Sequence, residues 1–350
     1  MNRKATWASI AFSIAVTACG SDPKPAATPD PSLTPPASST AASAKPAGTD
    51  GSAAASTSDD VTRGTTAVKA GDWTTARAAF EAAIKKNPKQ ADAYYYLGLV
   101  LDKTGDKPGA EKNYKAALDL QPDLQEAAEN LTAIYVESQR YDEAIGIAKK
   151  ALARNAKNAE LQLNLAVALS GKGDVDGASK AFDEALKLAP NDARFYLAYA
   201  DHLGAAKKND EAIAKLKQAQ RVAGDDPALL GTIGFAFRTA HAVPECIAVF
   251  DRAISLKDNA DFRTNRGMCK LGAKDKSGAI LDFQAATTKD PAFAPAHYWL
   301  ASAFHDDGKF PEAVAEYDAY LKAAPKGPMA KAAEAKQKLA KDKKKPAPKK

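Results

Sequence analysis

Residues 91–124 read ADAYYYLGLVLDKTGDKPGAEKNYKAALDLQPDL, and this stretch decides the fold. Apolar residues recur at helical spacing on both sides of Gly105-Asp106, where glycine can end one helix and aspartate can cap the next. Pro122 closes the second half, because proline cannot continue the hydrogen-bond ladder of a helix. The stretch therefore predicts two antiparallel helices joined by a short turn.

Prolines recur at the interval that this stretch sets. Pro88 and Pro122 are 34 residues apart, and Pro122 and Pro190 are separated by two such intervals. The interval returns between Pro291 and Pro325. A fixed period of this size indicates an array of helical-hairpin repeats.

Alignment on the prolines brings three further columns into register. The first half of each unit carries a small residue, at Gly64, Gly98, Thr132, Ala166, Ala200, Gly234, Gly267 and Ala301. The second half carries another, at Ala76, Ala110, Ala144, Ala178, Ala212, Cys246, Ala279 and Ala313. A mostly aromatic column follows four residues later, at Phe80, Tyr114, Ala148, Phe182, Leu216, Phe250, Phe283 and Tyr317. Small residues let two helix backbones approach closely, and the aromatic ring fills the space beside them.

These columns resemble the tetratricopeptide-repeat signature over residues 57–327. The resemblance implies an all-α fold, a right-handed superhelical solenoid of about eight hairpins whose first helices line the concave face. Residues 328–341 are predicted to form a capping helix with lysines on its open side, and 342–350 a basic disordered tail. Because packing uses every recurring feature, we expect a protein-binding array rather than an enzyme, with no catalytic residues and no cofactor.

Three units depart from the pattern. The third has Thr132 in a small column and Ala148 in the aromatic column. The sixth is one residue short, and the seventh places Arg266 and Lys270 on faces that are usually apolar. We therefore expect the stack to be most irregular over residues 258–270.

The N-terminus is predicted to be an export signal with a lipid site. Residues 1–18 hold a charged start and a short apolar run, as a cleaved signal peptide does. Val16-Thr17-Ala18-Cys19 resembles a bacterial lipobox, which implies a lipid (palmitate) on Cys19 rather than an ordinary secretory cleavage site. In that family Gly20, which stands where an inner-membrane protein carries aspartate, favours the outer membrane over the inner.

Residues 19–56 are rich in proline, alanine, serine and threonine, and they are predicted to form a disordered tether into the periplasm. The net charge of +6 belongs to the other end of the chain. Residues 331–350 hold nine lysines against Glu334 and Asp342, so the remaining 330 residues sum to −1. This balance argues against a nucleic-acid partner. The lysine tail is expected to be solvated, and the alternative is a weak contact with anionic lipid or envelope polymer.

Histidine and cysteine provide little chemistry. The four histidines match no metal-ligand motif, and a solvated or partner-facing role is expected for His297 and His305. Cys246 and Cys269 lie in adjacent repeats, where a disulfide is sterically conceivable. We expect two separate buried thiols, because free cysteine is commonly buried.

Five residues are candidates for peptide binding. Asn130, Asn164 and Asn265 share one column of the first helices, where the family resemblance implies contact with a ligand backbone. Surface or interhelical hydrogen bonding is the alternative. Tyr95 and Tyr298 belong to the aromatic triplets 94–96 and 297–299, each of which offers a possible partner contact beside a core residue.

The function predicted from these features is that of a membrane-anchored scaffold. A lipid on Cys19 would hold the chain at the envelope, and the concave face would dock or assemble a protein complex there. The alternative is a regulator of a cell-wall enzyme. Both functions require protein or peptide partners, and the sequence does not identify them.

Overall fold

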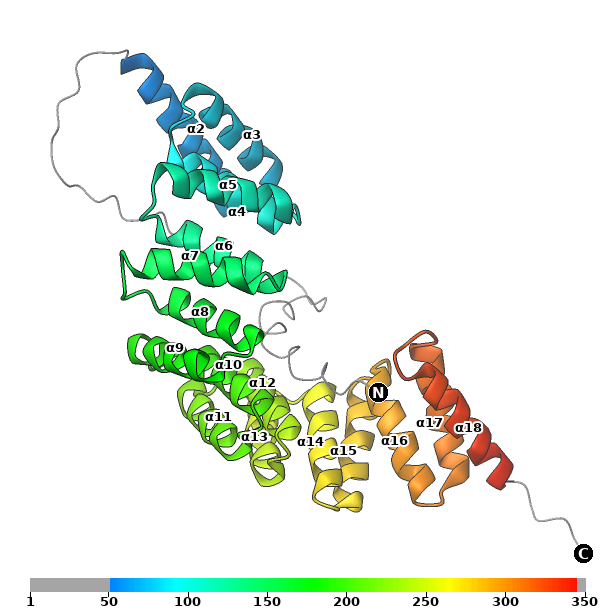
Figure 1. The fold of residues 1–350 in the computed structure, drawn as a ribbon. Helices are drawn as coiled ribbons and strands as arrows, with labels where there is room; N and C mark the ends of the chain where they lie inside the picture. The colour runs from blue at the N-terminus through cyan, green and yellow to red at the C-terminus, as the bar shows by residue number, and fades with distance from the viewer. Residues whose placement is uncertain (1–50, 345–350) are drawn as a thin grey trace, which may run out of the picture. The chain divides into compact units, whose positions relative to one another are not determined.

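The computed structural model describes residues 51–344, with side chains from Asp59 to Lys343, and every regular element in this range is a helix. These seventeen helices form eight antiparallel hairpins followed by one further helix (Figure 1). The helices are α2 Gly51–Ala70, α3 Trp73–Lys86, α4 Ala91–Lys103, α5 Lys107–Leu120, α6 Gln125–Glu137, α7 Tyr141–Leu152, α8 Ala159–Lys172, α9 Val175–Leu188, α10 Ala193–Ala205, α11 Asn209–Ala223, α12 Pro227–Thr239, α13 Val243–Leu256, α14 Ala260–Gly272, α15 Lys276–Lys289, α16 Ala294–Asp306, α17 Phe310–Ala323 and α18 Ala330–Lys344. The predicted all-α array of eight hairpins with a final helix is confirmed.

Both ends of the array extend beyond their predicted limits. Helix α2 begins at Gly51, six residues before the predicted start at Thr57. Helix α18 runs to Lys344, past the predicted limit at residue 341. Residues 51–56 and 342–344 were assigned to flexible segments because they lack large apolar side chains. Alanine and lysine are both strong helix formers, so such residues can still continue a helix. The predicted signal peptide, Cys19 and residues 20–50 lie outside the described residues.

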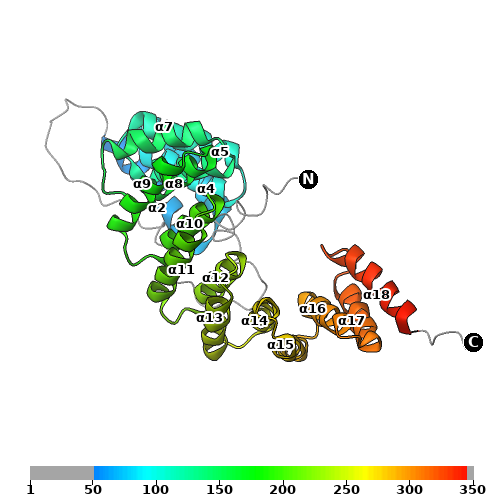
Figure 2. The same cartoon turned by 60° about the horizontal axis from the view of Figure 1, so that its bottom comes forward.

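The chain divides into two compact units between Pro190 and Asn191. We call helices α2–α9 the N-terminal unit and helices α10–α18 the C-terminal unit. Within each unit the hairpins follow one another in chain order, and Figure 2 shows this order for α12–α18. First helices contact the first helices of the next hairpin, for example α6 with α8 and α14 with α16. Each unit therefore has a continuous surface made of first helices, which we call its first-helix face.

The two helices of a hairpin meet where the small column faces the aromatic column. A Cβ atom added at Gly64 would lie 2.5 Å from the ring of Phe80, and one added at Gly98 would lie 2.8 Å from the ring of Tyr114. The same contact recurs between Gly267 and Phe283, at 2.6 Å. No real side chain tolerates such distances without movement, so at these positions the ring packs directly on the backbone of the partner helix.

The third hairpin keeps this contact with the sizes exchanged. Thr132 on α6 is fully buried, and so is Ala148 on α7, which stands in the aromatic column. The larger residue has moved to the first helix and the smaller one to the second. The hydroxyl of Thr132 donates a hydrogen bond to the carbonyl oxygen of Ala128 at 2.6 Å, so its burial leaves no unpaired polar atom.

Three of the turns follow the predicted Gly-Asp chemistry. Gly105 has a φ of +90°, a conformation that favours glycine. The side chain of Asp106 then accepts a hydrogen bond from the backbone nitrogen of Gly109 at 2.9 Å, which caps α5. Asp72 and Asp174 cap α3 and α9 in the same way.

The predicted irregularity over residues 258–270 is wrong. The division between the two units lies at Pro190 instead. The charged residues of the seventh hairpin are matched by Asp282 on α15, whose side chain is only 3% exposed. Its carboxylate accepts hydrogen bonds from both Nε and Nη2 of Arg266, and it pairs with Nζ of Lys270 at 2.8 Å. A buried carboxylate that is paired on both oxygens replaces the usual apolar contact without leaving an isolated charge.

The glycine–aromatic contact predicts that Gly98→Ala destabilises the protein by about 1–3 kcal/mol, because the added methyl group overpacks against Tyr114. Gly146 is the matched control, since it lies within a helix and a Cβ there would meet nothing within 4 Å. Gly146→Ala is expected to stabilise by up to about 1 kcal/mol through helix propensity. Urea unfolding of both variants measures the two effects, and the same sign for both would contradict the packing explanation.

Candidate functional site

The first-helix face of the N-terminal unit carries two of the predicted binding residues. Asn130 on α6 and Asn164 on α8 are half-buried, and they lie on adjacent hairpins. Nδ2 of Asn164 donates a hydrogen bond to the backbone oxygen of Glu129 at 3.2 Å, so this amide links α8 to α6. Asn130 lies beside the hydroxyl groups of Tyr95 and Tyr114. The interhelical alternative holds for Asn164, and ligand binding by either residue stays a prediction.

The same face is acidic. Asp92, Glu126, Glu129 and Glu160 come from three successive first helices, α4, α6 and α8, and all four are half-buried. Burial raises the pKa of Asp92 and Glu129, and for Glu129 a hydrogen bond from Nδ2 of Asn158 at 2.5 Å partly offsets that rise.

Two predicted aromatic residues are core residues instead. Tyr95 is 2% exposed and Tyr298 is 8% exposed, so neither presents its ring to a partner. The more exposed ring of the first triplet is Tyr94, which precedes Tyr95. In the second triplet it is Trp299, which follows Tyr298. A triplet spans 200° of a helix, so composition alone cannot tell which of its members faces inward; the packing of neighbouring hairpins decides it.

The C-terminal unit holds the third asparagine and a buried histidine. Nδ2 of Asn265 donates to the backbone oxygen of Asp261 at 3.0 Å and to its carboxylate at 3.1 Å, within α14. His297 is buried, which corrects the expectation of a solvated or partner-facing side chain. Its Nδ1 lies 2.6 Å from a carboxylate oxygen of Glu316, and its Nε2 lies 3.0 Å from the carbonyl oxygen of Pro291. Both partners accept hydrogen bonds, so the protonated ring satisfies both at once, and the pKa of His297 is raised.

The cysteines correct a second expectation. Cys246 on α13 and Cys269 on α14 form a disulfide, with their Cα atoms 6.1 Å apart. The expectation of two separate thiols is therefore wrong. The second helix of one hairpin packs on the first helix of the next, and these two positions face each other across that contact at a separation that a disulfide can span.

A cavity of about 280 Å³ opens beside the disulfide. The two cysteines line it together with Arg238 of α12, Met268 and Leu271 of α14 and Trp299 of α16. Phe235, one turn before Arg238 on α12, is 39% exposed. Trp299 belongs to the triplet 297–299, which the sequence marks as a possible partner contact. Arg238, Met268 and Leu271 belong to none of the repeat columns, so periodicity did not identify them.

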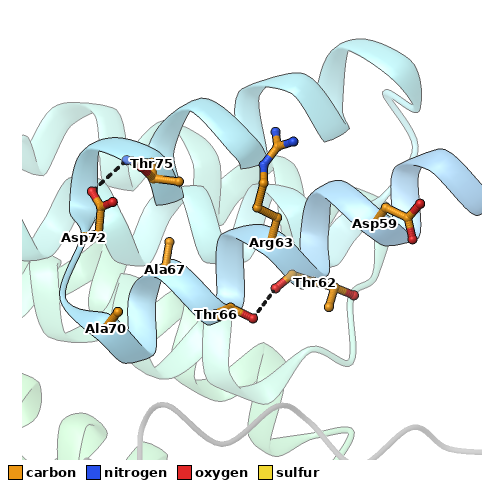
Figure 3. Close-up of a pocket in the computed structure, with 8 residues that line it drawn as sticks. All are labelled: Asp59, Thr62, Arg63, Thr66, Ala67, Ala70, Asp72 and Thr75. Carbon is orange, nitrogen blue, oxygen red and sulfur yellow. Dashed lines mark hydrogen bonds between the residues drawn. The ribbon is translucent and has the colours of Figure 1, made fainter.

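A second hollow, of about 490 Å³, lies on α2 and α3 (Figure 3). Small and polar side chains line it, and three of the polar ones have partners within the chain. The hydroxyl of Thr66 donates to the backbone oxygen of Thr62 at 2.8 Å, and Asp72 accepts from the backbone nitrogen of Thr75 at 3.0 Å. Arg63 pairs with Asp60 at 3.0 Å. These contacts use the polar atoms of Thr66, Asp72 and Arg63 within the chain.

Among the described residues no three histidine, cysteine or acidic side chains gather closely enough to hold a metal ion. No helix in the described part of the chain combines the length and apolarity that membrane spanning requires.

Family models described as tetratricopeptide repeat match residues 61–125, 135–201 and 264–328, which together are more than half of the chain. Protein FlbA of Caulobacter vibrioides is 33% identical over 128 residues, which are 37% of this chain and 22% of that protein. The serine/threonine-protein phosphatase T of Trypanosoma brucei brucei is 32% identical over 103 residues, 29% of this chain and 21% of the phosphatase. The chain thus spans about a fifth of the length of these relatives.

A solved structure shares the fold. The crystal structure of a tetratricopeptide repeat protein from Parabacteroides merdae superposes with a TM-score of 0.52 and 19% identity. The match covers 71% of this chain and 99% of that protein. At this identity the likeness concerns the fold alone.

The disulfide predicts a redox-dependent stability. Closing a loop between residues 246 and 269 should add about 3 kcal/mol, so reductant is expected to lower the urea midpoint of the protein. The Cys269→Ala variant is the control, because reductant should not change its midpoint. Alkylation of the unfolded, unreduced protein at both Cys246 and Cys269 would contradict the disulfide.

His297 predicts a pH-dependent stability of the last hairpin. Its folded pKa lies above the unfolded value of about 6.5, so its contribution is complete below pH 6.5 and is lost as the pH rises through the folded pKa. Amide hydrogen exchange in α16, followed from pH 5.5 to 8.5 and corrected for intrinsic rates, should show protection that falls with pH. His297→Gln and Glu316→Gln should both remove this dependence; an unchanged profile in either variant would exclude the pair as its source.

Proposed function

The chain belongs to the tetratricopeptide repeat family, whose arrays are protein-interaction scaffolds, and from this premise we propose that it docks or assembles a protein complex in a bacterial cell envelope. Its own lipid anchor would hold it there, and it would act by binding rather than by catalysis. The two first-helix faces carry the proposal. Each displays side chains that are only partly buried or exposed: asparagines and carboxylates in the N-terminal unit, and Phe235, Met268 and Trp299 in the C-terminal unit.

The location rests on the sequence. Val16-Thr17-Ala18-Cys19 has the residue types of a lipobox, and the proline-rich residues that follow suit a tether. A lipid on Cys19 and a long tether would place the repeats at a distance from the membrane, free to engage a partner. Gly20 favours the outer membrane.

Anchoring is tested by metabolic labelling with an alkyne fatty acid in a Gram-negative host. The unaltered protein is expected to incorporate the label and to sediment with membranes. Cys19→Ala should do neither, whereas Ser38→Ala, a control within the tether, should do both. Label in the Cys19→Ala protein, or its absence from the unaltered protein, would refute the lipid site.

Docking is tested with a photo-crosslinking residue placed at Asn130 on the first-helix face. The matched control places the same residue at Lys112, which is exposed on the second helix α5. In native envelopes, Asn130 is expected to capture discrete proteins that Lys112 does not. Capture of a cell-wall synthase would favour the regulatory alternative, and identical products from both positions would count against a scaffold that binds through this face.

A further inference from the structure

The cavity beside the disulfide is suited to one large apolar side chain. Sites that hold whole small molecules measure about 300–1,000 Å³, and this cavity measures about 280 Å³. Met268 and Leu271 on α14 and Trp299 on α16 supply partly exposed apolar walls. Phe235 extends the apolar surface along α12. A segment of polypeptide that inserts a single side chain fits these dimensions better than a free metabolite does.

Arg238 gives this apolar site an unbalanced charge. Its guanidinium group stacks 4.7 Å above the ring of Phe235, and its Nε is buried with no hydrogen-bond partner. Among the described residues no carboxylate lies within ion-pair distance of it. Burial lowers the pKa of Arg238 overall. The carboxylate of Asp261 raises this pKa electrostatically, but that carboxylate already accepts a hydrogen bond from Asn265.

A half-buried cation without an anion is costly, and the cost is recovered when an anion arrives. Stacking on Phe235 occupies the flat face of the guanidinium, so the donors on its edge remain available for a carboxylate. Arg238 and Met268 line the same cavity, so a ligand that fills the cavity also brings its neighbouring groups to the arginine.

We propose that this groove binds an extended segment of a partner protein that carries an aspartate or glutamate beside a large apolar residue. The apolar side chain enters the cavity between Met268 and Trp299, and the acidic side chain pairs with Arg238. The inference rests on the proposed scaffold function, and it adds the chemistry of the partner segment and the unit that reads it. The acidic first-helix face of the N-terminal unit would not select such a segment, because its charge is of the same sign.

The test is a selection from phage-displayed random 12-residue peptides, embedded within the coat protein so that any carboxylate comes from a side chain. The full chain is compared with Arg238→Gln, Arg238→Lys and Trp299→Ala. Arg252→Gln is the matched control, because it removes an arginine whose side chain is half exposed on α13 and already paired with Asp225. Circular dichroism confirms that each variant is folded.

The unaltered chain and Arg252→Gln are expected to enrich peptides with an acidic residue within two positions of a large apolar one. Arg238→Gln should lose the acidic preference, Arg238→Lys should retain part of it, and Trp299→Ala should lose the apolar preference. An enriched peptide should bind Arg238→Gln about ten- to a hundred-fold more weakly in fluorescence anisotropy. Replacing its acidic residue by the amide should cause a similar loss, and the two changes together should not be additive.

Four results would overturn the inference: no enrichment, enrichment without acidic residues, enrichment that Arg238→Gln leaves unchanged, or self-association of the chain that Arg238→Gln abolishes. The last result would assign the groove to a second copy. None of these affects the capture of envelope proteins at Asn130. Conversely, a failure of that capture leaves the peptide selection unaffected, so the two proposals fail independently.

Discussion

Most hairpins of this protein carry an aromatic ring that packs against the partner helix. Where the first helix carries glycine, as at Gly98, the ring of Tyr114 occupies the volume that a side chain would take. The contact fixes the distance between the two helices and the side on which they meet. Where the ring is missing, at Ala148, the larger Thr132 restores the filled volume from the other side. The third hairpin therefore accommodates residues whose sizes are exchanged between the two columns.

That contact also determines which surfaces remain for function. The residues of the aromatic column and of the two small columns pack between the helices. The side chains on the outward side of the first helices are therefore free to vary. In the N-terminal unit it carries carboxylates and the amides of Asn130 and Asn164. In the C-terminal unit it carries exposed apolar side chains and the unpaired Arg238. One scaffold thus presents two faces of different chemistry.

Much of this could be predicted from periodicity, and some could not. The hairpins follow from a local pattern that repeats eight times, and the Gly-Asp turns and the final helix follow from local sequence as well. The prediction that Cys246 and Cys269 are separate thiols was wrong. A column of residues in one hairpin does not show which residues of the next hairpin it faces. Tyr95 and Tyr298 were named as candidate peptide-binding residues, and the structure buries both of them for a similar reason. His297 was expected to be solvated or partner-facing. Its two acceptors, Glu316 and the carbonyl oxygen of Pro291, lie outside its own helix, so local sequence did not reveal them.

The sequence by itself determined the kind of fold, because the 34-residue period, the small columns and the aromatic column are local and recur in register. It also predicts a lipid on Cys19, because the lipobox pattern depends only on neighbouring residues. Tertiary structure alone decided which side chains pair across hairpins, such as Arg266 with Asp282, and which charges stay unpaired, such as Arg238. These outcomes depend on distances between residues in different helices and on the removal of water around them, and neither quantity is written in the order of the residues.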